Sequence, residues 1–519
     1  MDQKLVSMSQ QLLIGEALKY AAHIVPEREA FVYGDLRFTY KDFLDRASHL
    51  AGWLQSHGIA KNDKVGCLFK NGMPFVELYF GTSLCGGVFV PVNFRLVSKE
   101  IDYIVNQSDI KILFVEEEFI DRLTPIISKL SKVEMIVLVG CSDFDLGIGF
   151  VTYDSIYDTP VNFQQKELQD DDAHAIIYTS GTTGKPKGAV LTHKNLYTNG
   201  LNKLYHSNLR KDVRQIVSAP LFHVAALSQL VQNCLVKGTI HLHRDFEPER
   251  ILTTIQNERI NSVGMVPAMW NFLFQVPNFQ DYDVSSIMSC SMGGAICPLE
   301  LKKRIMAVFE NAEILESFGQ TEMSPATTYL TGEDSLRKTD SVGKPAINVR
   351  VRVVDDVMND VPIGEIGEIV YQGPTTMKEY YKNPEATKEA FKGGWFHSGD
   401  LVRVDEEGFI YVVDRKKDMI ISGGENIYPK EIEEILYRHT DILEASVIGV
   451  PDPDWGESVK ACIVMKPDKQ LTKEQVIEYC QRWLASYKKP KLVDFLDSLP
   501  RNGAGKVLKT VLRNENYQK

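Results

Sequence analysis

The sequence has no apolar run that approaches the roughly 20 residues a helix needs to cross a bilayer. Its first residues, MDQKLVSMSQQLL, include an acid and lack the apolar stretch of a secretory signal. These absences predict a cytoplasmic protein without a transmembrane segment. The lysine run Lys488, Lys489 and Lys491 is interpreted as solvated, although it leaves peripheral membrane contact open.

Cysteine pairs are also missing. The eight cysteines are scattered singly, and the two closest, Cys290 and Cys297, lie seven positions apart. This spacing argues against a disulfide framework or a zinc site and favours reduced thiols. His241 and His243 share one face of an expected strand, but no third ligand is evident. We therefore interpret both histidines as surface residues.

Positive charge is in deficit. The chain has 58 basic and 69 acidic residues among 519, so its net charge is −11. A dedicated nucleic-acid binder usually carries a basic domain, and none is predicted here. The composition, 44% hydrophobic and 24% charged, is that of an ordinary globular chain long enough for two to four domains.

The first 320 residues alternate between helical and strand patterns. Tyr40–His57 and Met73–Leu84 have the apolar spacing of helices, whereas Lys64–Phe69 and Gly87–Val92 are typical of short buried strands. This order predicts parallel sheets covered by helices.

The pattern changes near residue 340. Val349–Val354, Gly364–Tyr371 and Gly408–Val413 are typical of strands separated by turns, which predicts a β-barrel-like part at about 340–416. Helices and strands then mix again; the expected elements are Lys430–His439, Ala445–Val450, Lys460–Met465 and Thr472–Leu484. We therefore predict an α/β fold with a large N-terminal domain, 1–416, and a small, mobile α+β domain, 417–519.

The strongest functional signal is the segment YTSGTTGKPKG at 178–188. Glycines let backbone N–H groups turn toward an anion, hydroxyls donate further hydrogen bonds, and lysines supply charge. The segment therefore predicts a polyphosphate site made by Thr179, Ser180, Gly181, Thr182, Thr183, Gly184, Lys185 and Lys187. A Walker A loop is excluded, because only two residues separate Gly181 from Gly184 and Pro186 follows the lysine.

This segment resembles the phosphate loop of the adenylate-forming superfamily, which includes acyl-CoA synthetases, aryl-CoA ligases and peptide-synthetase adenylation domains. Further segments resemble that family's other motifs in the same order: SFGQTE at 317–322, WFHSGD at 395–400, DRKKD at 414–418, SGGENIYP at 422–429 and PRNGAGK at 500–506. The ordered matches extend over most of the chain.

The resemblance implies two half-reactions. A carboxylate and Mg²⁺-bound ATP give an acyl-adenylate and pyrophosphate, and the thiol of coenzyme A then displaces AMP. An acyl-CoA synthetase is the favoured function. The alternatives are an aryl-CoA ligase of the coumarate or benzoate type, a stand-alone adenylation enzyme that loads a carrier protein, and a nucleotide sensor without turnover.

The resemblance also implies roles for single residues. Lys506 would contact the substrate carboxylate and the α-phosphate, Glu322 would bind Mg²⁺, and Thr321 would bind the α-phosphate. Phe318 stands where the family commonly has tyrosine, so it can stack on adenine but offers no phenol. The other implied nucleotide contacts are Gly293, Gly294, Ala295, Ser317, Gly319, Asp400 and Arg415.

For the second half-reaction, Lys417 occupies the family's hinge position. Gly423 and Gly424 would line the tunnel for the pantetheine of CoA. Trp455 either packs on the CoA adenine or belongs to a core. The sequence does not fix the oligomeric state, and a homodimer is possible.

The implied acyl pocket is mostly apolar and comprises His223, Val224, Met269, Trp270, Met292 and Gln320. No aspartate is placed to bind an α-amino group, which argues against an amino acid as substrate. An apolar carboxylic acid, aliphatic or aromatic, fits best. Val266–Phe279 resembles bacterial fatty-acyl-CoA synthetases most, so a fatty acid is favoured.

Overall fold

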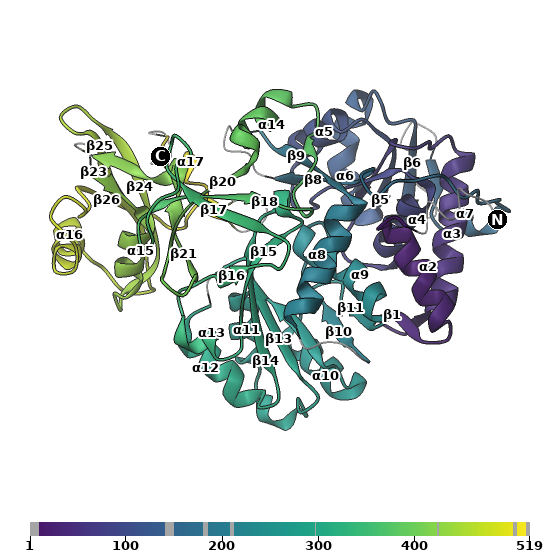
Figure 1. Ribbon diagram of the computed structural model, residues 1–519, viewed down its shortest axis with the longest axis horizontal. Helices are drawn as coiled ribbons and strands as arrows, with labels where there is room; N and C mark the ends of the chain where they lie inside the picture. Colours follow the sequence, from purple (N-terminus) through teal and green to yellow (C-terminus); the bar gives the residue numbers. More distant parts are fainter. Residues whose placement is uncertain are drawn as a thin grey trace. The chain divides into compact units, whose positions relative to one another are not determined.

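The computed structural model describes residues 10–140, 150–179, 185–207, 212–295, 297–422, 425–501 and 506–514. The chain forms two compact units (Figure 1). Unit 1 comprises residues 1–351 and 371–396, and unit 2 comprises residues 352–370 and 397–519.

Unit 1 contains a nine-stranded sheet of order β16-β15-β14-β13-β12-β10-β11-β1-β2. Its strands are β1 (Glu29–Tyr33), β2 (Leu36–Thr39), β10 (Arg214–Val217), β11 (Thr239–Leu242), β12 (Ser262–Met265), β13 (Ser289–Gly293), β14 (Glu313–Gly319), β15 (Ala326–Thr331) and β16 (Lys344–Pro345). The strands from β1 through β11, β10, β12 and β13 to β14 pair in parallel, and β15 runs antiparallel to β14. The predicted parallel sheet is thus confirmed.

A second sheet of unit 1 has eight strands in the order β19-β9-β8-β4-β3-β5-β6-β7. They are β3 (Lys64–Leu68), β4 (Val88–Pro91), β5 (Ile110–Glu116), β6 (Met135–Val139), β7 (Phe150–Thr152), β8 (Ala173–Thr179), β9 (Lys187–Thr192) and β19 (Glu379–Tyr380). Strands β8 and β9 form an antiparallel pair, and β19 extends the sheet beyond β9.

Helices surround these sheets in unit 1 (Figure 1). They are α2 (Ile14–Ile24), α3 (Tyr40–Ser56), α4 (Met73–Cys85), α5 (Ser98–Gln107), α6 (Ile120–Leu123), α7 (Ser155–Asp158), α8 (His193–His206), α9 (Val224–Val236), α10 (Pro248–Glu258), α11 (Pro267–Leu273), α12 (Leu299–Val308), α13 (Asp334–Arg337) and α14 (Pro384–Ala390). Helices α3 and α4 confirm the two helices expected near the N-terminus. Helix α3 begins at a capping box, in which Asp42 N–H donates to Thr39 Oγ1 at 3.1 Å.

Unit 2 is built on two smaller sheets. One has the order β17-β18-β20-β21, with β17 (Arg350–Val354), β18 (Gly367–Gln372), β20 (Phe396–Val404) and β21 (Ile410–Arg415). The other has the order β23-β22-β25-β24 with β26 beside β25; it comprises β22 (Ile420–Ser422), β23 (Glu425–Ile427), β24 (Ile442–Asp452), β25 (Gly456–Met465) and β26 (Leu492–Phe495). Its helices are α15 (Pro429–Tyr437), α16 (Lys473–Gln481) and α17 (Lys509–Leu512).

The division of the two units differs from the predicted boundary at residue 416. Strand β21 is tied to helix α15, because Lys430 N–H donates to Asp414 Oδ2 at 2.9 Å and Lys430 Nζ donates to Val412 O at 2.8 Å. Within the expected β-barrel-like part at 340–416, β17, β18, β20 and β21 form a sheet of their own, whereas β16 joins the nine-stranded sheet and β19 the eight-stranded one. A hinge at Lys417 stays a prediction.

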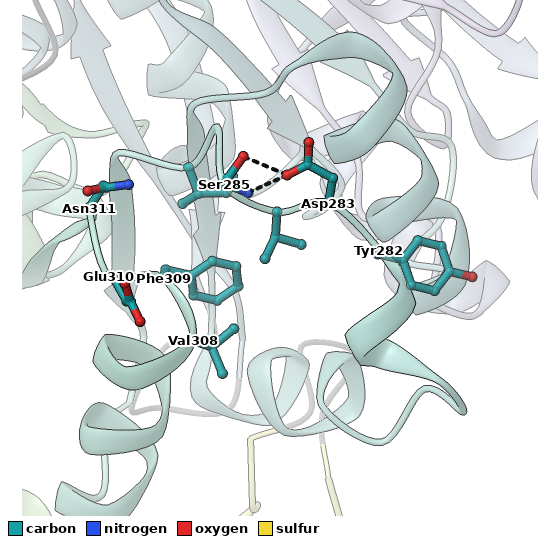
Figure 2. A pocket seen from close by; sticks show the side chains of 9 residues that line it. Tyr282, Asp283, Ser285, Val308, Phe309, Glu310 and Asn311 are labelled. Atoms are coloured by element: carbon teal, nitrogen blue, oxygen red, sulfur yellow. Dashed lines mark hydrogen bonds between the residues drawn. The ribbon is translucent and has the colours of Figure 1, made fainter.

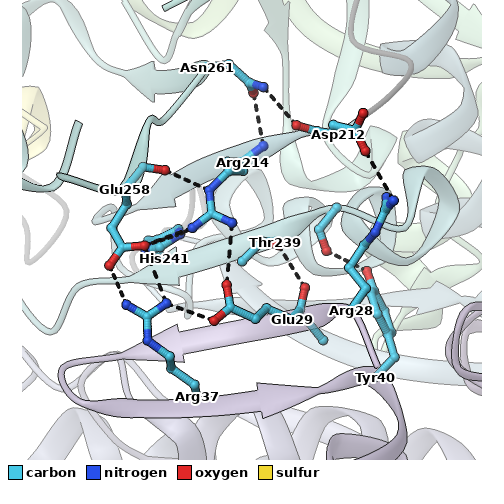
Figure 3. Close-up of polar contacts among 12 residues, drawn as sticks. Arg28, Glu29, Arg37, Tyr40, Asp212, Arg214, Thr239, His241, Glu258 and Asn261 are labelled. Atoms are coloured by element: carbon cyan, nitrogen blue, oxygen red, sulfur yellow. Dashed lines mark hydrogen bonds and ion pairs between the residues drawn. The ribbon is translucent and has the colours of Figure 1, made fainter. Parts of the chain in front are cut away.

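The prediction that His241 and His243 lie at the surface is wrong. Only 2% of His241 and 4% of His243 are exposed, and burial lowers the pKa of each to about 4. Figure 3 shows His241 inside a network of ion pairs, where Arg214 Nη2 lies 3.0 Å from its Nε2 and 2.8 Å from Glu258. This network joins α10 to the edge of the nine-stranded sheet.

The cysteines, possible metal ligands and helices of the described ranges bear on the expectations about disulfides, zinc and membranes. Seven cysteines lie there, and all seven are buried and free. In the same ranges, no three histidine, cysteine, aspartate or glutamate residues gather as a metal site would require. None of the helices described is both long and apolar enough to span a bilayer.

Candidate functional site

The glycine-rich segment connects two paired strands. Thr179 at the end of β8 faces Lys187 at the start of β9, and its Oγ1 donates to the carbonyl of Lys187 at 3.5 Å. Both ends of the predicted phosphate loop are therefore fixed by the sheet. Ser180, Gly181, Thr182, Thr183 and Gly184 lie outside the described residues, so their predicted phosphate contacts stay predictions.

Two lysines of this segment lie beside aromatic rings. The Lys185 ammonium is 5.8 Å from the centroid of Tyr103, and the Lys187 ammonium is 5.2 Å from the centroid of Tyr380. Attraction between a cation and a ring face orients such side chains without neutralising their charge. Both lysines thus keep a positive charge available for an anionic ligand.

The glycines at 293 and 294 meet the second motif at one edge of the nine-stranded sheet. Gly293 pairs with Ser317 across parallel strands, and a Cβ on Gly293 would lie 3.0 Å from Ser317 Oγ. Gly294 has a φ of +78°, which favours glycine, and Ala295 beside it is exposed. The carboxyl ends of parallel strands are the usual place for a ligand in such sheets.

A tight turn follows β14 and presents the acidic residue of the motif. Gly319 is required there, because a Cβ would lie 2.0 Å from the carbonyl oxygen of Pro325. The N–H of Gln320 donates to the same oxygen at 2.9 Å. The turn carries Thr321, half-buried, and Glu322, 8% exposed.

Tyr380 links the two motifs and was not predicted from the sequence. Its hydroxyl donates to Glu322 Oε1 at 2.7 Å, while its ring lies beside Lys187. Its strand, β19, pairs with β9, and the N–H of Met377 donates to the carbonyl of Glu322 at 2.7 Å. No sequence pattern distinguishes Tyr380 from the adjacent Tyr381, so this role could not be predicted.

His223 and Val224 lie at the start of α9. The carbonyl of His223 accepts the N–H groups of Ala226 and Leu227, each at 3.0 Å. Burial, reinforced by the charge of Arg95, lowers the pKa of His223 to about 4. Its imidazole is therefore neutral at pH 7, which suits contact with an apolar acid.

The other predicted acyl residues are placed differently. Trp270 is fully buried in an apolar cluster that includes Met292, and Met269 packs against that cluster. Gln320 stands at the turn after β14, and its side-chain Nε2 is buried with no hydrogen bond from the described residues. The structure thus places Trp270 in a core, and contact of these four residues with an acid stays a prediction.

Unit 2 brings together the two residues implied in ribose binding. Asp400 and Arg415 are directly opposed on β20 and β21, and Arg415 Nε lies 2.7 Å from Asp400 Oδ1. Arg415 also donates to the carbonyl of Ser398 at 3.2 Å. Only 3% of Asp400 is exposed, so the pair has a fixed geometry.

Lys506 belongs to the same charged cluster. Although the residue as a whole is exposed, the surrounding protein lowers the pKa of its ammonium, and the charges of Arg415 and Lys417 lower it further. Asp400 and Asp418 oppose this effect. Burial also lowers the pKa of Lys417. The predicted catalytic, ribose and hinge residues of unit 2 therefore share one electrostatic environment.

Trp455 is not a core residue, so that interpretation is wrong. It lies in the turn between β24 and β25, is 53% exposed, and has the ammonium of Lys491 4.9 Å from its ring centroid. An exposed indole beside a cation suits a ligand with a flat ring and phosphates. The predicted contact with CoA stays a prediction, and Gly423 and Gly424 lie outside the described residues.

One pocket lies away from all these residues. It has a volume of about 270 Å³ and is bordered by Tyr282 and Asp283 on one side and by Val308, Phe309 and Glu310 at the end of α12 on the other (Figure 2). Asp283 is already engaged there, because it accepts the hydroxyl of Ser285 at 2.6 Å. None of the residues in the motifs borders this pocket.

Comparisons with known proteins agree with the motif positions. Residues 18–381 match the family model described as AMP-binding enzyme, and residues 431–506 match that of the AMP-binding enzyme C-terminal domain. The chain is 37% identical over 493 residues to a feruloyl-CoA synthase of Amycolatopsis sp., which covers 95% of this chain and 96% of that protein.

Two further relatives are similar over nearly the whole length. A long-chain-fatty-acid–CoA ligase of Mycobacterium tuberculosis is 36% identical over 507 residues, with 97% of this chain and 98% of that protein covered. The structure of an O-succinylbenzoate coenzyme A synthetase of Bacillus subtilis, in complex with ATP and magnesium ion, has a TM-score of 0.85 at 29% identity and covers 96% of this chain and 99% of that one.

Proposed function

Because the chain belongs to the AMP-binding enzyme family, we propose that it converts an apolar carboxylic acid, with a fatty acid as the first choice, to its CoA thioester. The chain is an AMP-forming acid–thiol ligase of the acyl- and aryl-CoA ligase family.

In the first half-reaction, a carboxylate oxygen attacks the α-phosphorus of ATP and the bond to pyrophosphate breaks. The difficulty is electrostatic, because two anions must meet. Lys185 and Lys187 offset the phosphate charge, and Lys506 contacts the carboxylate. At about 4 Å and an effective dielectric constant of about 20, such a contact contributes about 4 kcal/mol, or roughly three decades in rate.

Glu322 fits a magnesium ion that is held mainly by the substrate. Magnesium prefers hard oxygen ligands and is commonly bound by one or two carboxylates and the phosphates of a nucleotide. Glu322 offers one buried carboxylate, oriented by Tyr380 at 2.7 Å. The ion would neutralise charge on the phosphates as pyrophosphate leaves.

In the second half-reaction, the CoA thiolate attacks the acyl carbonyl carbon and AMP leaves with the electron pair of the broken C–O bond. Trp455 would hold the CoA adenine, and Gly423 and Gly424 would leave room for the pantetheine arm. Lys417 would be the hinge about which the small C-terminal domain rotates between the two half-reactions.

The observation that carries the proposal is the linkage of Lys187 and Glu322 through Tyr380. The Tyr380 side chain contacts both the lysine that we propose to bind phosphate and the carboxylate that we propose to bind magnesium. A fatty acid is supported by the mycobacterial long-chain ligase and by the apolar residues Val224, Met269 and Met292. An aromatic acid is the second candidate, because the feruloyl-CoA synthase is similar to the same extent.

The test is pyrophosphate release from ATP with a panel of fatty and aromatic acids, each with and without CoA. Release that requires a fatty acid, with acyl-CoA formed, supports the proposal. A preference for cinnamic or benzoic acids supports the aryl-CoA ligase. Adenylate formation without CoA transfer points to a carrier protein as acceptor, and no release with any acid contradicts the proposal.

A further inference from the structure

Helix α8 has an inverted distribution of polar and apolar residues in its second half. Asn199 and Asn202 are 3% and 0% exposed, whereas Leu201 and Tyr205 are 43% and 61% exposed. A helix at the surface of a protein normally turns its apolar side inward. Burying amides instead is unfavourable unless their hydrogen bonds are satisfied.

Some of these bonds are made within unit 1. Asn199 Nδ2 donates to the carbonyl of Ala326 at 2.9 Å, and Asn202 Nδ2 donates to Asn348 Oδ1 at 2.8 Å. These bonds attach α8 to the start of β15 and to the segment after β16. They account for the two amide nitrogens and leave other polar atoms of this region unexplained.

Five buried polar atoms here have no hydrogen-bond partner within the described ranges. They are Asn202 Oδ1, His206 Nε2 and Ser207 Oγ from α8 and its end, Gln232 Oε1 from α9, and Tyr329 Oη from β15. Tyr329 is 4% and Gln232 3% exposed, and the ring of His206 stacks on that of Tyr329 at 4.5 Å between centroids. Buried polar atoms without a partner need an explanation, and a polar group on a bound ligand would satisfy them.

Lys203 faces the same region. On a helix it lies between Gly200, whose Cβ would be 3.1 Å from Leu235 of α9, and Asn199 and His206, which contact β15. No hydrogen bond or ion pair of its ammonium occurs among the residues that the structure describes. Burial lowers its pKa to about 8. An ammonium without a carboxylate partner favours an oxygen-bearing, electron-rich ligand.

This polar region lies beyond the predicted entrance of the acyl pocket. Asn199 Nδ2 donates to the carbonyl of Met323, in the turn that carries Glu322, at 3.4 Å, and Lys203 is one helical turn, about 6 Å, further along α8. On α9, Gln232 lies nine residues after His223, or about 13 Å along the helix. Helices α8 and α9 lie side by side (Figure 1). The polar region therefore lies within the length of a medium-chain acid from His223.

We propose that Lys203, Gln232 and Tyr329, with His206, form a subsite for an oxygen function at the far end of the substrate acid. The inference rests on the proposed function, since it takes the acid's own carboxylate to lie near His223. The favoured substrates are apolar between their ends and carry a second carboxylate or a hydroxyl group at the far end.

The test compares matched acids in wild-type enzyme. Sebacic acid is paired with capric acid, and 4-coumaric acid with cinnamic acid, so that each pair differs in the far-end oxygen. The variants are Lys203→Met and Tyr329→Phe, which remove a polar atom and keep the shape. The control is Tyr205→Phe, an equal change on the exposed side of α8. The readout is the ratio of kcat/KM within each pair.

Wild-type enzyme is expected to prefer the oxygenated acid of at least one pair by about tenfold or more, because a site built for hydrogen bonds rejects analogues without them. Lys203→Met or Tyr329→Phe should abolish that preference, and Tyr205→Phe should keep it. A preference for the plain acid in both pairs, or equal losses for both members of a pair in the variants, would overturn the inference. If no acid released pyrophosphate, the proposed function would be at fault instead.

Discussion

Tyr380 allows the proposed metal site to be perturbed without touching its ligand. Its hydroxyl donates to the carboxylate of Glu322 at 2.7 Å, and only 9% of the residue is exposed. Tyr380→Phe removes this donor and preserves the ring beside Lys187. Water has little access to Glu322, which is 8% exposed, so it replaces the lost bond poorly.

The size of the effect follows from this geometry. A hydrogen bond to a charged group contributes about 1.5–3 kcal/mol. That corresponds to about a 10- to 150-fold change in an equilibrium constant. Because the bond orients a carboxylate that binds Mg²⁺, we expect the change in the affinity for the metal and not in the affinity for the acid.

The assay is the Mg²⁺ concentration that gives half-maximal pyrophosphate release, together with Mn²⁺ binding to the ATP complex by electron paramagnetic resonance. In Tyr380→Phe the half-maximal Mg²⁺ concentration should rise, and the affinity for Mn²⁺ should fall, at least about tenfold. The matched control is Tyr381→Phe, whose lost bond goes to Asp109 at 2.8 Å, away from Glu322. Unchanged metal dependence in Tyr380→Phe would refute the reasoning. An equal change in Tyr381→Phe would show that the effect comes from a general loss of structure and not from the bond to Glu322.

Four further predictions concern single residues. Lys506→Ala should slow acyl-adenylate formation about 100-fold or more and spare thioester formation from added acyl-adenylate; equal losses in both would contradict its role. Because Lys417 lowers the pKa of Lys506, Lys417→Met should move the high-pH loss of adenylation to higher pH, which a pH–rate profile checks. Trp455→Ala should raise the KM for CoA and leave CoA-independent pyrophosphate release unchanged. Gly319→Ala should lower the melting temperature by about 3 °C or more, because its Cβ would lie 2.0 Å from the carbonyl oxygen of Pro325.

Local patterns predicted the secondary structure well. The expected helix Tyr40–His57 occurs as Tyr40–Ser56, and the expected strand Lys64–Phe69 occurs as Lys64–Leu68. Both have their periodicity and their end signals within the segment itself. The parallel order of the central strands also follows from the alternation of strands and helices.

Pairings between distant segments could not be predicted. Strand β19 has only two residues, and nothing in its composition indicates that it pairs with β9. The same holds for the attachment of α15 to β21 through Asp414, which shifts the unit boundary away from residue 416. Such contacts depend on where whole elements pack, which periodicity along the chain does not record.

The burial of single side chains was also hard to predict from the sequence. His241 was expected at the surface but is buried. Trp455, for which a core position was one of two interpretations, is exposed. His241 is buried because Arg214 and Glu258 supply its polar contacts from other elements. Trp455 is exposed because it stands at the turn after a long strand. Asp400 and Arg415, which the motifs assign to the same ribose, face each other on adjacent strands, and their contact with ribose stays a prediction.

The most direct test of the central claim follows the oxygen atoms of the acid. The acid is supplied with oxygen-18 in both carboxylate positions, together with ATP, Mg²⁺ and CoA, and the AMP formed is analysed by mass spectrometry. If the carboxylate attacks the α-phosphorus and the thiol then attacks the acyl carbon, AMP carries one labelled oxygen. Unlabelled AMP, or label in inorganic phosphate, would contradict the acyl-adenylate route.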